Sequence, residues 1–172
     1  MPGTPHPVAA RVCWSDDGRV SPVLNHVSVV AHDLETSLRF YVDELGLEPV
    51  ATPDFGFPVV WLAAGDCQIH LFERAGEPPS HAHFGLEIAE FMPVYRRMKE
   101  LGALDSTTFG NAMYELPDGG IQMYVRDPAG NLVELDHPDA SSIPQDEVPE
   151  YMRLADLRPQ QGEARSATLW HR

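Results

Sequence analysis

Four residues of the sequence carry side chains that bind divalent metals, and they occupy matched positions in two halves of the chain. His26 and His83 lie in the first predicted strand of each half, and His70 and Glu134 lie in the last. Imidazole nitrogens and carboxylate oxygens are ligands for zinc and for other first-row divalent ions. A lone histidine in an apolar strand is more often a buried structural residue, but the matched positions favour a shared metal site. His81 lies on the same strand face as His83 and is the competing candidate.

The matched positions follow from a weak internal duplication. The segments Asn25–Val30 and His81–Ile88 each alternate in residue type, as strands do. Each segment is followed by a helical pattern, over 33–45 and 90–101, and each helix is expected to end at the same Glu-Leu-Gly sequence. The two halves therefore begin with the same order of elements.

Three short β-rich runs follow each predicted helix. These runs are Leu47–Thr52, Pro58–Ala63 and Cys67–Phe72 in the first half, and Ala103–Thr108, Gly120–Arg126 and Leu132–His137 in the second. Each half is thus predicted to be a βαβββ module, and the chain an α+β protein of two such modules with curved sheets. Neither sheet would be stable alone, so we expect the modules to pack as one unit. A two-fold relation between them would bring the four metal-binding side chains into one cavity.

Composition limits the classes of partner. The chain has 172 residues with 12 Lys and Arg against 26 Asp and Glu, a formal net charge of −14. Such a negative surface repels phosphate backbones and anionic lipids, so nucleic acids and membranes are not expected partners. The two cysteines, Cys13 and Cys67, form no metal or redox spacing, and a cytoplasmic location is expected.

The patterned part of the chain lies between two proline-containing ends. We predict an N-terminal extension, a central domain of two modules, and a C-terminal tail in which Pro149–Leu157 has a helical pattern. The boundaries are 1–21 for the extension, 22–138 for the domain with modules of about 22–75 and 80–138, and 139–172 for the tail.

Several motifs of the central block resemble the vicinal oxygen chelate superfamily, which contains glyoxalase I, bleomycin-resistance proteins and extradiol dioxygenases. The stretches that carry the resemblance are Asn25–Val29, Arg39–Leu47, Trp61–Leu62, Gln68–Leu71 and Tyr124–Leu135. Trp61–Leu62 followed by Gln68–Leu71 also resembles a small glyoxalase-like subgroup of this superfamily. The resemblance covers about two thirds of the chain.

The resemblance implies a single divalent metal ion, such as Zn²⁺, Ni²⁺, Fe²⁺, Mn²⁺ or Co²⁺, held between the modules. His26, His83 and Glu134 fall where most metal-using members have ligands. His70 falls at the fourth ligand position, where glyoxalase I enzymes have a glutamate. Small members commonly pair, so the resemblance also implies a homodimer that acts on a small molecule.

The first functional expectation is a metal-dependent lyase or isomerase. Its substrate would carry two adjacent oxygens, and the metal would polarise a carbonyl and stabilise an enolate. Glu134 is the candidate general base. Glu87, on the same strand face as His83, is a second candidate.

Two alternatives remain open. The first is an extradiol-type dioxygenase that uses Fe²⁺, because Tyr124 and Glu134 match the signature around the glutamate ligand of those enzymes. Tyr124 would then donate a hydrogen bond to a substrate oxygen. The second alternative is a protein that binds a drug or another ligand without catalysis, as the resistance members do.

Overall fold

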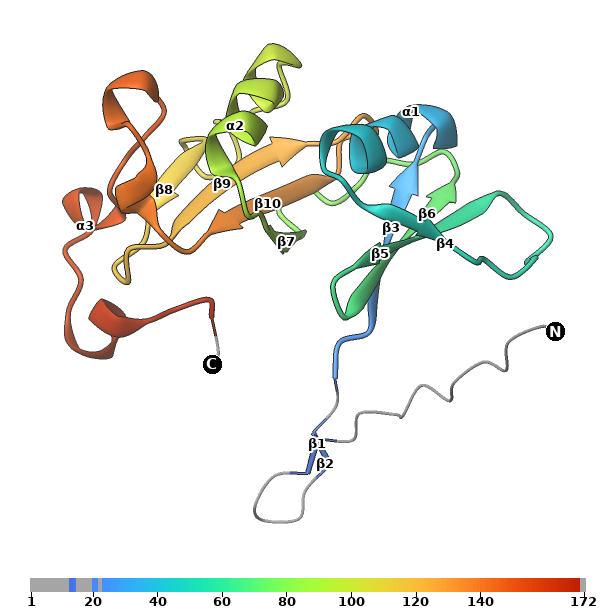
Figure 1. Ribbon diagram of the computed structural model, residues 1–172, viewed down its shortest axis with the longest axis horizontal. Coiled ribbons are helices and arrows are strands. Elements are labelled where there is room, and N and C mark those ends of the chain that lie inside the picture. Colours follow the sequence, from blue (N-terminus) through green and yellow to red (C-terminus); the bar gives the residue numbers. More distant parts are fainter. Residues whose placement is uncertain (1–12, 15–19, 22, 171–172) are drawn as a thin grey trace, which may run out of the picture.

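The computed structural model describes residues 13–14, 20–21 and 23–170. Eight of its strands, β3 to β10, form two four-stranded sheets (Figure 1). The first sheet has the order β3-β6-β5-β4 and the second has the order β7-β10-β9-β8. In each sheet the first and last strands of the module pair in parallel, and the other pairs are antiparallel. The strands are β3 (His26–Ala31), β4 (Glu48–Val50), β5 (Val59–Ala64), β6 (Cys67–Glu73), β7 (His83–Glu87), β8 (Met113–Glu115), β9 (Ile121–Arg126) and β10 (Leu132–His137). The α+β architecture of two βαβββ modules is confirmed.

The two predicted helices form as the capping residues suggest. In the first module, α1 (Leu34–Leu38) begins after Asp33, whose carboxylate accepts a hydrogen bond from the backbone of Thr36 at 2.7 Å. It continues as a π-helix, η1 (Arg39–Glu44). In the second module, α2 spans Phe91–Glu100. Both helices end at a glycine with a positive φ, a conformation that costs glycine little.

One predicted strand is wrong. Residues 103–108 form no strand, and the second strand of the second module in chain order is β8 (Met113–Glu115) instead. The Asp105 carboxylate accepts hydrogen bonds from the backbone and hydroxyl groups of Thr107 and Thr108 at 2.7 to 3.0 Å, which makes a turn where the strand was expected. Only Leu104 retains a bridge, to Val125. Local side-chain hydrogen bonds therefore outweigh the β propensity of this run.

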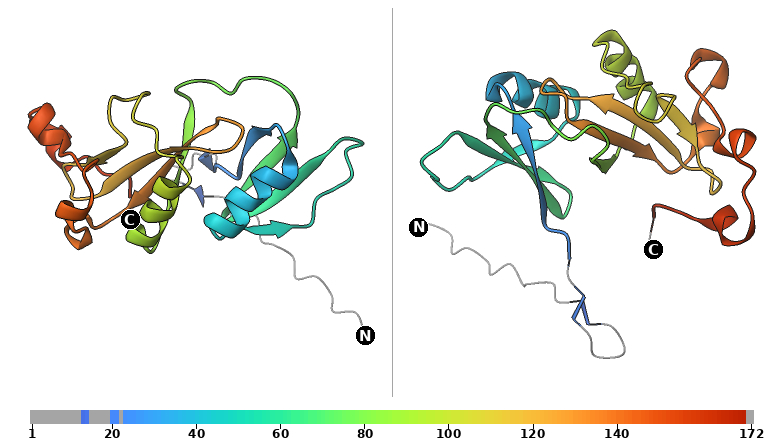
Figure 2. Two further views of the ribbon diagram at one scale, coloured as in Figure 1. Left: turned by 90° about the horizontal axis from the view of Figure 1, so that it is seen from above. Right: turned by 180° about the vertical axis from the view of Figure 1, so that it is seen from behind.

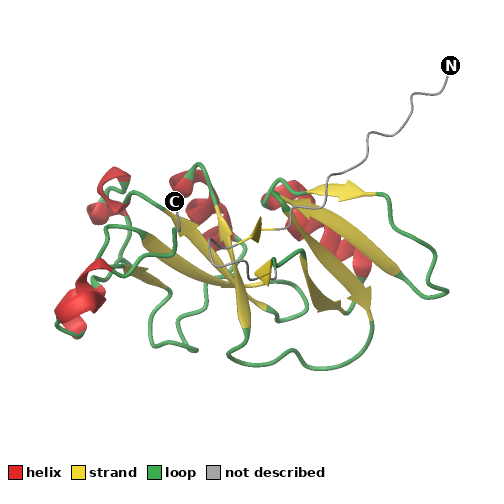
Figure 3. Cartoon of the chain, turned by 90° about the horizontal axis from the view of Figure 1, so that it is seen from below, coloured by secondary structure: helices red, strands yellow, loops and turns green. Residues whose placement is uncertain are grey.

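The helices cover one face of each sheet and leave the other face open. Helix α2 lies over the second sheet and α1 with η1 over the first, on the same side of the molecule (Figures 1 and 3). The buried apolar side chains of the helices and of the covered sheet faces form one core cluster. Its largest fully buried members are Tyr41, Tyr95, Leu62, Ile69, Leu71, Met98, Met113, Ile121, Met123 and Leu135. The candidate site residues must consequently lie on the opposite, open faces.

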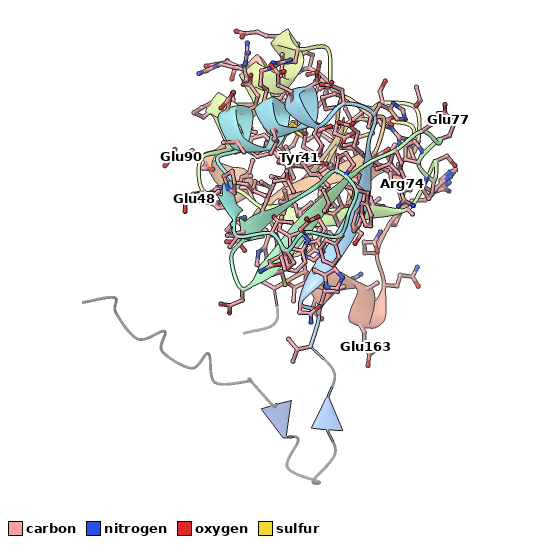
Figure 4. All side chains as sticks on the ribbon, turned by 90° about the vertical axis from the view of Figure 1, so that its right-hand side faces the viewer. Tyr41, Glu48, Arg74, Glu77, Glu90 and Glu163 are labelled. Atoms are coloured by element: carbon pink, nitrogen blue, oxygen red, sulfur yellow. The ribbon has the colours of Figure 1, made fainter. Side chains whose placement is uncertain are left out.

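Polar contacts join the two modules across this core. The hydroxyl of Tyr41, from η1, donates to Asp127 in the turn before β10 at 2.8 Å, and the side-chain amide of Asn131 donates to the carbonyl oxygen of Val30 at 2.7 Å. Tyr41 lies well inside the molecule, whereas Glu48 and Arg74 lie at its edge (Figure 4). Burial and then the Asp127 carboxylate raise the pKa of Tyr41 well above its usual range, so this phenol stays a donor.

Replacing Tyr41 with phenylalanine removes this buried donor between the modules. Asp127 keeps its bonds from Ala129 and Asn131, so we expect a loss of about 1–2 kcal/mol of unfolding free energy in urea denaturation. Tyr114→Phe is the matched control, because that phenol donates to the carbonyl of Phe109 at an exposed position. Equal losses in both variants would contradict a special role for the bond between modules.

The C-terminal tail packs on the second module. It contains two 3₁₀ turns, η2 (Ala140–Ser142) and η3 (Gln145–Glu147), then α3 (Leu154–Leu157) and η4 (Gly162–Ser166). Ile143 and Val148 are buried in the core. The helical part of the tail is shorter than the predicted Pro149–Leu157, and the tail follows the outer edge of the second sheet (Figure 2).

Most of the predicted N-terminal extension lies outside the described residues. Its two described segments, β1 (Cys13–Trp14) and β2 (Val20–Ser21), form a short antiparallel pair. Within the described part of the chain, no helix has both the length and the apolar character needed to cross a membrane.

Candidate metal centre

The open face of the second sheet carries one predicted ligand pair. Strand pairing places Glu134 of β10 directly between Gly85 of β7 and Tyr124 of β9. His83 precedes Gly85 by two residues on the same face of β7. The alternation read from the sequence is therefore correct for this module.

His83 and Glu134 face each other at close range. His83 Nε2 lies 3.4 Å from Glu134 Oε2, and the carboxylate is almost wholly buried. His83 Nδ1 donates to the carbonyl oxygen of His81 at 2.9 Å, which leaves Nε2 with its lone pair. Gln122 donates to Glu134 Oε1 at 2.7 Å. In a histidine that binds metal, the other ring nitrogen typically donates a hydrogen bond to a carbonyl oxygen. A carboxylate ligand is likewise typically held by a further hydrogen-bond donor.

The first module presents the other predicted pair. His26 Nδ1 donates to the side-chain oxygen of Asn25 at 2.7 Å, so its Nε2, like that of His83, keeps a free lone pair. The His70 ring is stacked between the rings of His26, at 4.4 Å, and Trp61, at 4.2 Å. Burial, followed by the neighbouring His26, lowers the pKa of His70, so a neutral imidazole is favoured.

His70 differs from His26 and His83 in one respect. Its Nε2 already donates to the side chain of Gln68 at 2.9 Å, so Nδ1 carries the free lone pair. The donor arrangement therefore fits His26 and His83 as ligands through Nε2 and leaves His70 with a different orientation.

The structure brings the four predicted ligands together as two pairs. Among residues 23–170, no three His, Cys, Asp or Glu side chains gather closely enough to bind one metal ion. His26 and His83 line the same cleft of about 600 Å³ between the modules. His70 lies in a hollow of about 590 Å³ on the first module, which His26 also lines. Each module thus offers half of the predicted ligand set.

Asp136 is a site residue that we did not predict. It follows Glu134 by two residues on β10, so strand alternation places both carboxyl groups on the open face. Burial and then the Glu134 carboxylate raise the pKa of Asp136 above its usual range. A Cβ atom at Gly85 would come within 2.8 Å of the Asp136 carboxyl oxygen, so glycine makes room for the acidic pair. The sequence around Asp136 looks like that of an ordinary surface aspartate, and only its burial in the structure distinguishes it.

Tyr124 lies beside the ligand pair of the second module. Its ring meets the His83 ring edge-on at 5.8 Å and the Phe109 ring at 4.7 Å. Burial, followed by the Glu134 carboxylate, raises the pKa of Tyr124 far above its usual range. The phenol is therefore neutral and is a hydrogen-bond donor at the site.

Other candidates from the sequence have structural roles. His81 contributes its backbone carbonyl to His83, and its ring bonds to Ser80. The second candidate base, Glu87, accepts a hydrogen bond at 2.6 Å from the indole of Trp170 in the C-terminal tail. Glu87 is thus engaged by the tail.

Paired βαβββ modules whose open faces carry histidines and a glutamate define a class of protein, and comparisons with known proteins agree. The family model described as the Glyoxalase/Bleomycin resistance protein/Dioxygenase superfamily matches residues 23–135. The chain belongs to this superfamily.

One curated protein and two solved structures are similar to the chain. The chain is 29% identical over 134 residues to the Arabidopsis thaliana protein named Glyoxylase I 4, covering 70% of this chain and 73% of that one. A protein of Bacillus anthracis assigned to the glyoxalase family has a similar structure, with a TM-score of 0.56 and 23% identity over 69% of this chain and 97% of its own. Lactoylglutathione lyase from Agrobacterium tumefaciens has a TM-score of 0.51 and 24% identity over 68% and 94% of the two chains. At these sequence identities, the similarity to the two solved structures shows a shared fold and nothing about activity.

Proposed function

We propose that the protein is a divalent-metal-dependent lyase or isomerase of the glyoxalase type, with His26, His83 and Glu134 as metal ligands and His70 as a fourth. The observation that carries the proposal is that His26 and His83 leave the same ring nitrogen free. Each donates through Nδ1 to a neighbouring oxygen and keeps Nε2 free, and His83 Nε2 faces a buried carboxylate. A histidine with only a structural role has no need of a ring nitrogen left free of hydrogen bonds.

A bound divalent ion would act as a Lewis acid on a substrate with two adjacent oxygens. The residues of the chain orient the substrate and move its proton. Glu134, which would leave the ion during turnover, accepts the proton from the carbon beside the carbonyl and returns it to the neighbouring carbon, while Gln122 donates to its other carboxylate oxygen. Tyr124 donates a hydrogen bond to a substrate oxygen, because its raised pKa keeps the phenol protonated.

We further propose that the complete ligand set forms between two copies of the chain, in a homodimer. The support is the division of the ligands into two pairs on two separate open faces, since a second copy can place the first-module pair opposite the second-module pair. Phe55 and Phe57 rim the hollow around His70 and are about half exposed, as expected of a surface that a partner covers.

Mixing two inactive variants tests both the ligands and their division between chains. One chain carries His26→Ala and His70→Ala, and the other carries His83→Ala and Glu134→Gln. Each variant alone is expected to bind no metal. Co-expressed with different tags and purified as a mixed dimer, the two chains are expected to regain one metal ion per dimer by elemental analysis.

The outcomes separate the two parts of the proposal. A mixed dimer without metal, beside a wild-type protein that binds it, would show that the ligands come from one chain. Full metal content in either variant alone would overturn the ligand assignment.

An extradiol-type dioxygenase is a second candidate, and the position of Tyr124 next to Glu134 and His83 is the observation that favours it. Protein purified without oxygen and loaded with Fe²⁺ would then consume oxygen when catechol is added. An isomerase or lyase would turn over without oxygen.

A further inference from the structure

A cavity of about 600 Å³ lies where the C-terminal tail meets the open face of the second sheet. One wall comes from β8, β9 and the loop before them, and the other from α3 and the residue that follows it. The lining residues are Phe109, Tyr114, Gln122, Tyr124, Leu154, Leu157 and Arg158. The tail lies beyond the part of the chain that the family model matches, so this wall is an addition to the shared fold.

The cavity adjoins the ligand pair of the second module. Gln122 and Tyr124 belong to both, since Gln122 lines the cavity and also donates to Glu134 at 2.7 Å. The Phe109 ring contacts Tyr124 at 4.7 Å and His83 at 5.6 Å. A molecule bound next to His83 and Glu134 would therefore extend into this cavity.

Arg158 is exceptional among the basic residues of the described chain. Every other lysine or arginine that the structure describes contacts a carboxylate, an aromatic ring or a carbonyl oxygen. These residues are Arg39, Arg74, Arg96, Arg97, Lys99, Arg126, Arg153 and Arg165. The guanidinium of Arg158 has no such partner within residues 23–170, although acidic residues outnumber basic ones by more than two to one.

The walls of the cavity indicate which ligand would bind there. Leu154, Leu157 and Phe109 offer apolar surface for a ring or an alkyl body. An unpaired guanidinium binds a carboxylate through two parallel hydrogen bonds. Because the net charge of −14 repels anions elsewhere, a local arginine decides whether an anionic group can enter.

We propose that the C-terminal tail forms the far wall of the substrate cavity and that Arg158 binds a carboxylate at the end of the substrate remote from its two adjacent oxygens. The inference rests on the proposed function, and it names the substrate class: a small, mostly apolar acid with vicinal oxygens at the opposite end. Arg158 sets specificity and has no part in the chemical step.

A pair of matched probes tests this assignment. Catechol offers the two adjacent oxygens alone, and 3,4-dihydroxybenzoate adds a carboxylate at the opposite edge of the ring. In calorimetric titrations of the Zn²⁺-loaded protein we expect 3,4-dihydroxybenzoate to bind at least about tenfold more tightly than catechol. Arg158→Ala should abolish that preference and leave the catechol affinity unchanged, and Arg158→Lys should keep part of it. Arg165→Ala, a neighbouring arginine that does not line the cavity, should behave like the wild type.

A second titration separates this inference from the metal site. Benzoate added to the metal-free protein should shift the methyl resonances of Leu154 and Leu157, and should do so several-fold more weakly in Arg158→Ala. This result in a protein that fails to bind Zn²⁺ would retain the Arg158 assignment and reject the proposed function. Equal affinities of wild type and Arg158→Ala for both carboxylate probes, or no benzoate binding to the wild type, would overturn the inference.

Discussion

Replacing His83 with alanine is expected to weaken binding of the divalent metal by at least about 100-fold, because it removes the nitrogen that faces the buried Glu134 carboxylate at 3.4 Å. Substituting a group that only supports a metal ligand lowers the metal affinity about 10- to 100-fold, so the loss of a ligand itself should lower it by at least about 100-fold. The measurement is a competition titration against a metal-binding dye, with elemental analysis of the purified variant.

His81→Ala is the matched control for this experiment. His81 lies two residues before His83, ahead of the start of β7, and serves His83 through its backbone carbonyl, which the substitution keeps. We expect metal binding close to that of the wild type in this variant. If His81→Ala lost the metal and His83→Ala kept it, His81 would be the ligand in place of His83.

Replacing Asp105 with alanine is expected to cost about 3 kcal/mol of unfolding free energy, since it breaks a buried ion pair and leaves several donors without an acceptor. The Asp105 carboxylate accepts from Arg126 Nε at 2.6 Å and from Thr107 and Thr108. Arg126 also donates to the carbonyl oxygens of Ser80 and Gly130. Asp105 therefore holds the loop that leads into β7, and the variant should also bind metal more weakly.

The stability of the wild type should depend on pH through the same carboxylate. Burial alone would raise the pKa of Asp105, but the hydrogen bonds from Thr108 and Thr107 outweigh it and hold the pKa well below its usual range. The unfolded chain consequently binds a proton at a higher pH than the folded chain does. The stabilisation is present above the unfolded pKa of about 4 and is lost as the pH falls below it.

Asp105→Asn provides the control for this pH dependence, because it keeps the size of the side chain and removes the charge. In urea unfolding experiments, the difference in free energy between wild type and Asp105→Asn should be largest near pH 7 and should shrink as the pH falls from about 5 to 3. A difference that stays constant over this range would show that the charge of Asp105 does not stabilise the fold.

Much of the fold is predictable from the sequence because its signals are local. The two-residue alternation around His83 and Glu134 depends only on neighbours along the strand, and β10 begins and ends as predicted. Asp33 and the glycines after both helices also act within one turn, and they lie where the structure needs them. The family follows from such short motifs as well.

Local side-chain hydrogen bonds and tertiary contacts together decided the rest. The run 103–108 has β propensity, but Asp105 is pulled into a turn by Thr107 and Thr108 and is paired with Arg126, which is distant in the sequence. Whether Asp136 is a surface carboxyl or a buried partner of Glu134 depends on what covers β10.

The same distinction applies to the candidate site as a whole. The sequence by itself determined which side chains share a strand face, because the geometry of a strand repeats every two residues. It did not determine that the two predicted ligand pairs would stay apart instead of gathering at one point, or that Arg158 of the tail would line a cavity beside Tyr124. Those arrangements depend on the packing of segments far apart in the chain, and no local period of the sequence encodes the free energy of that packing.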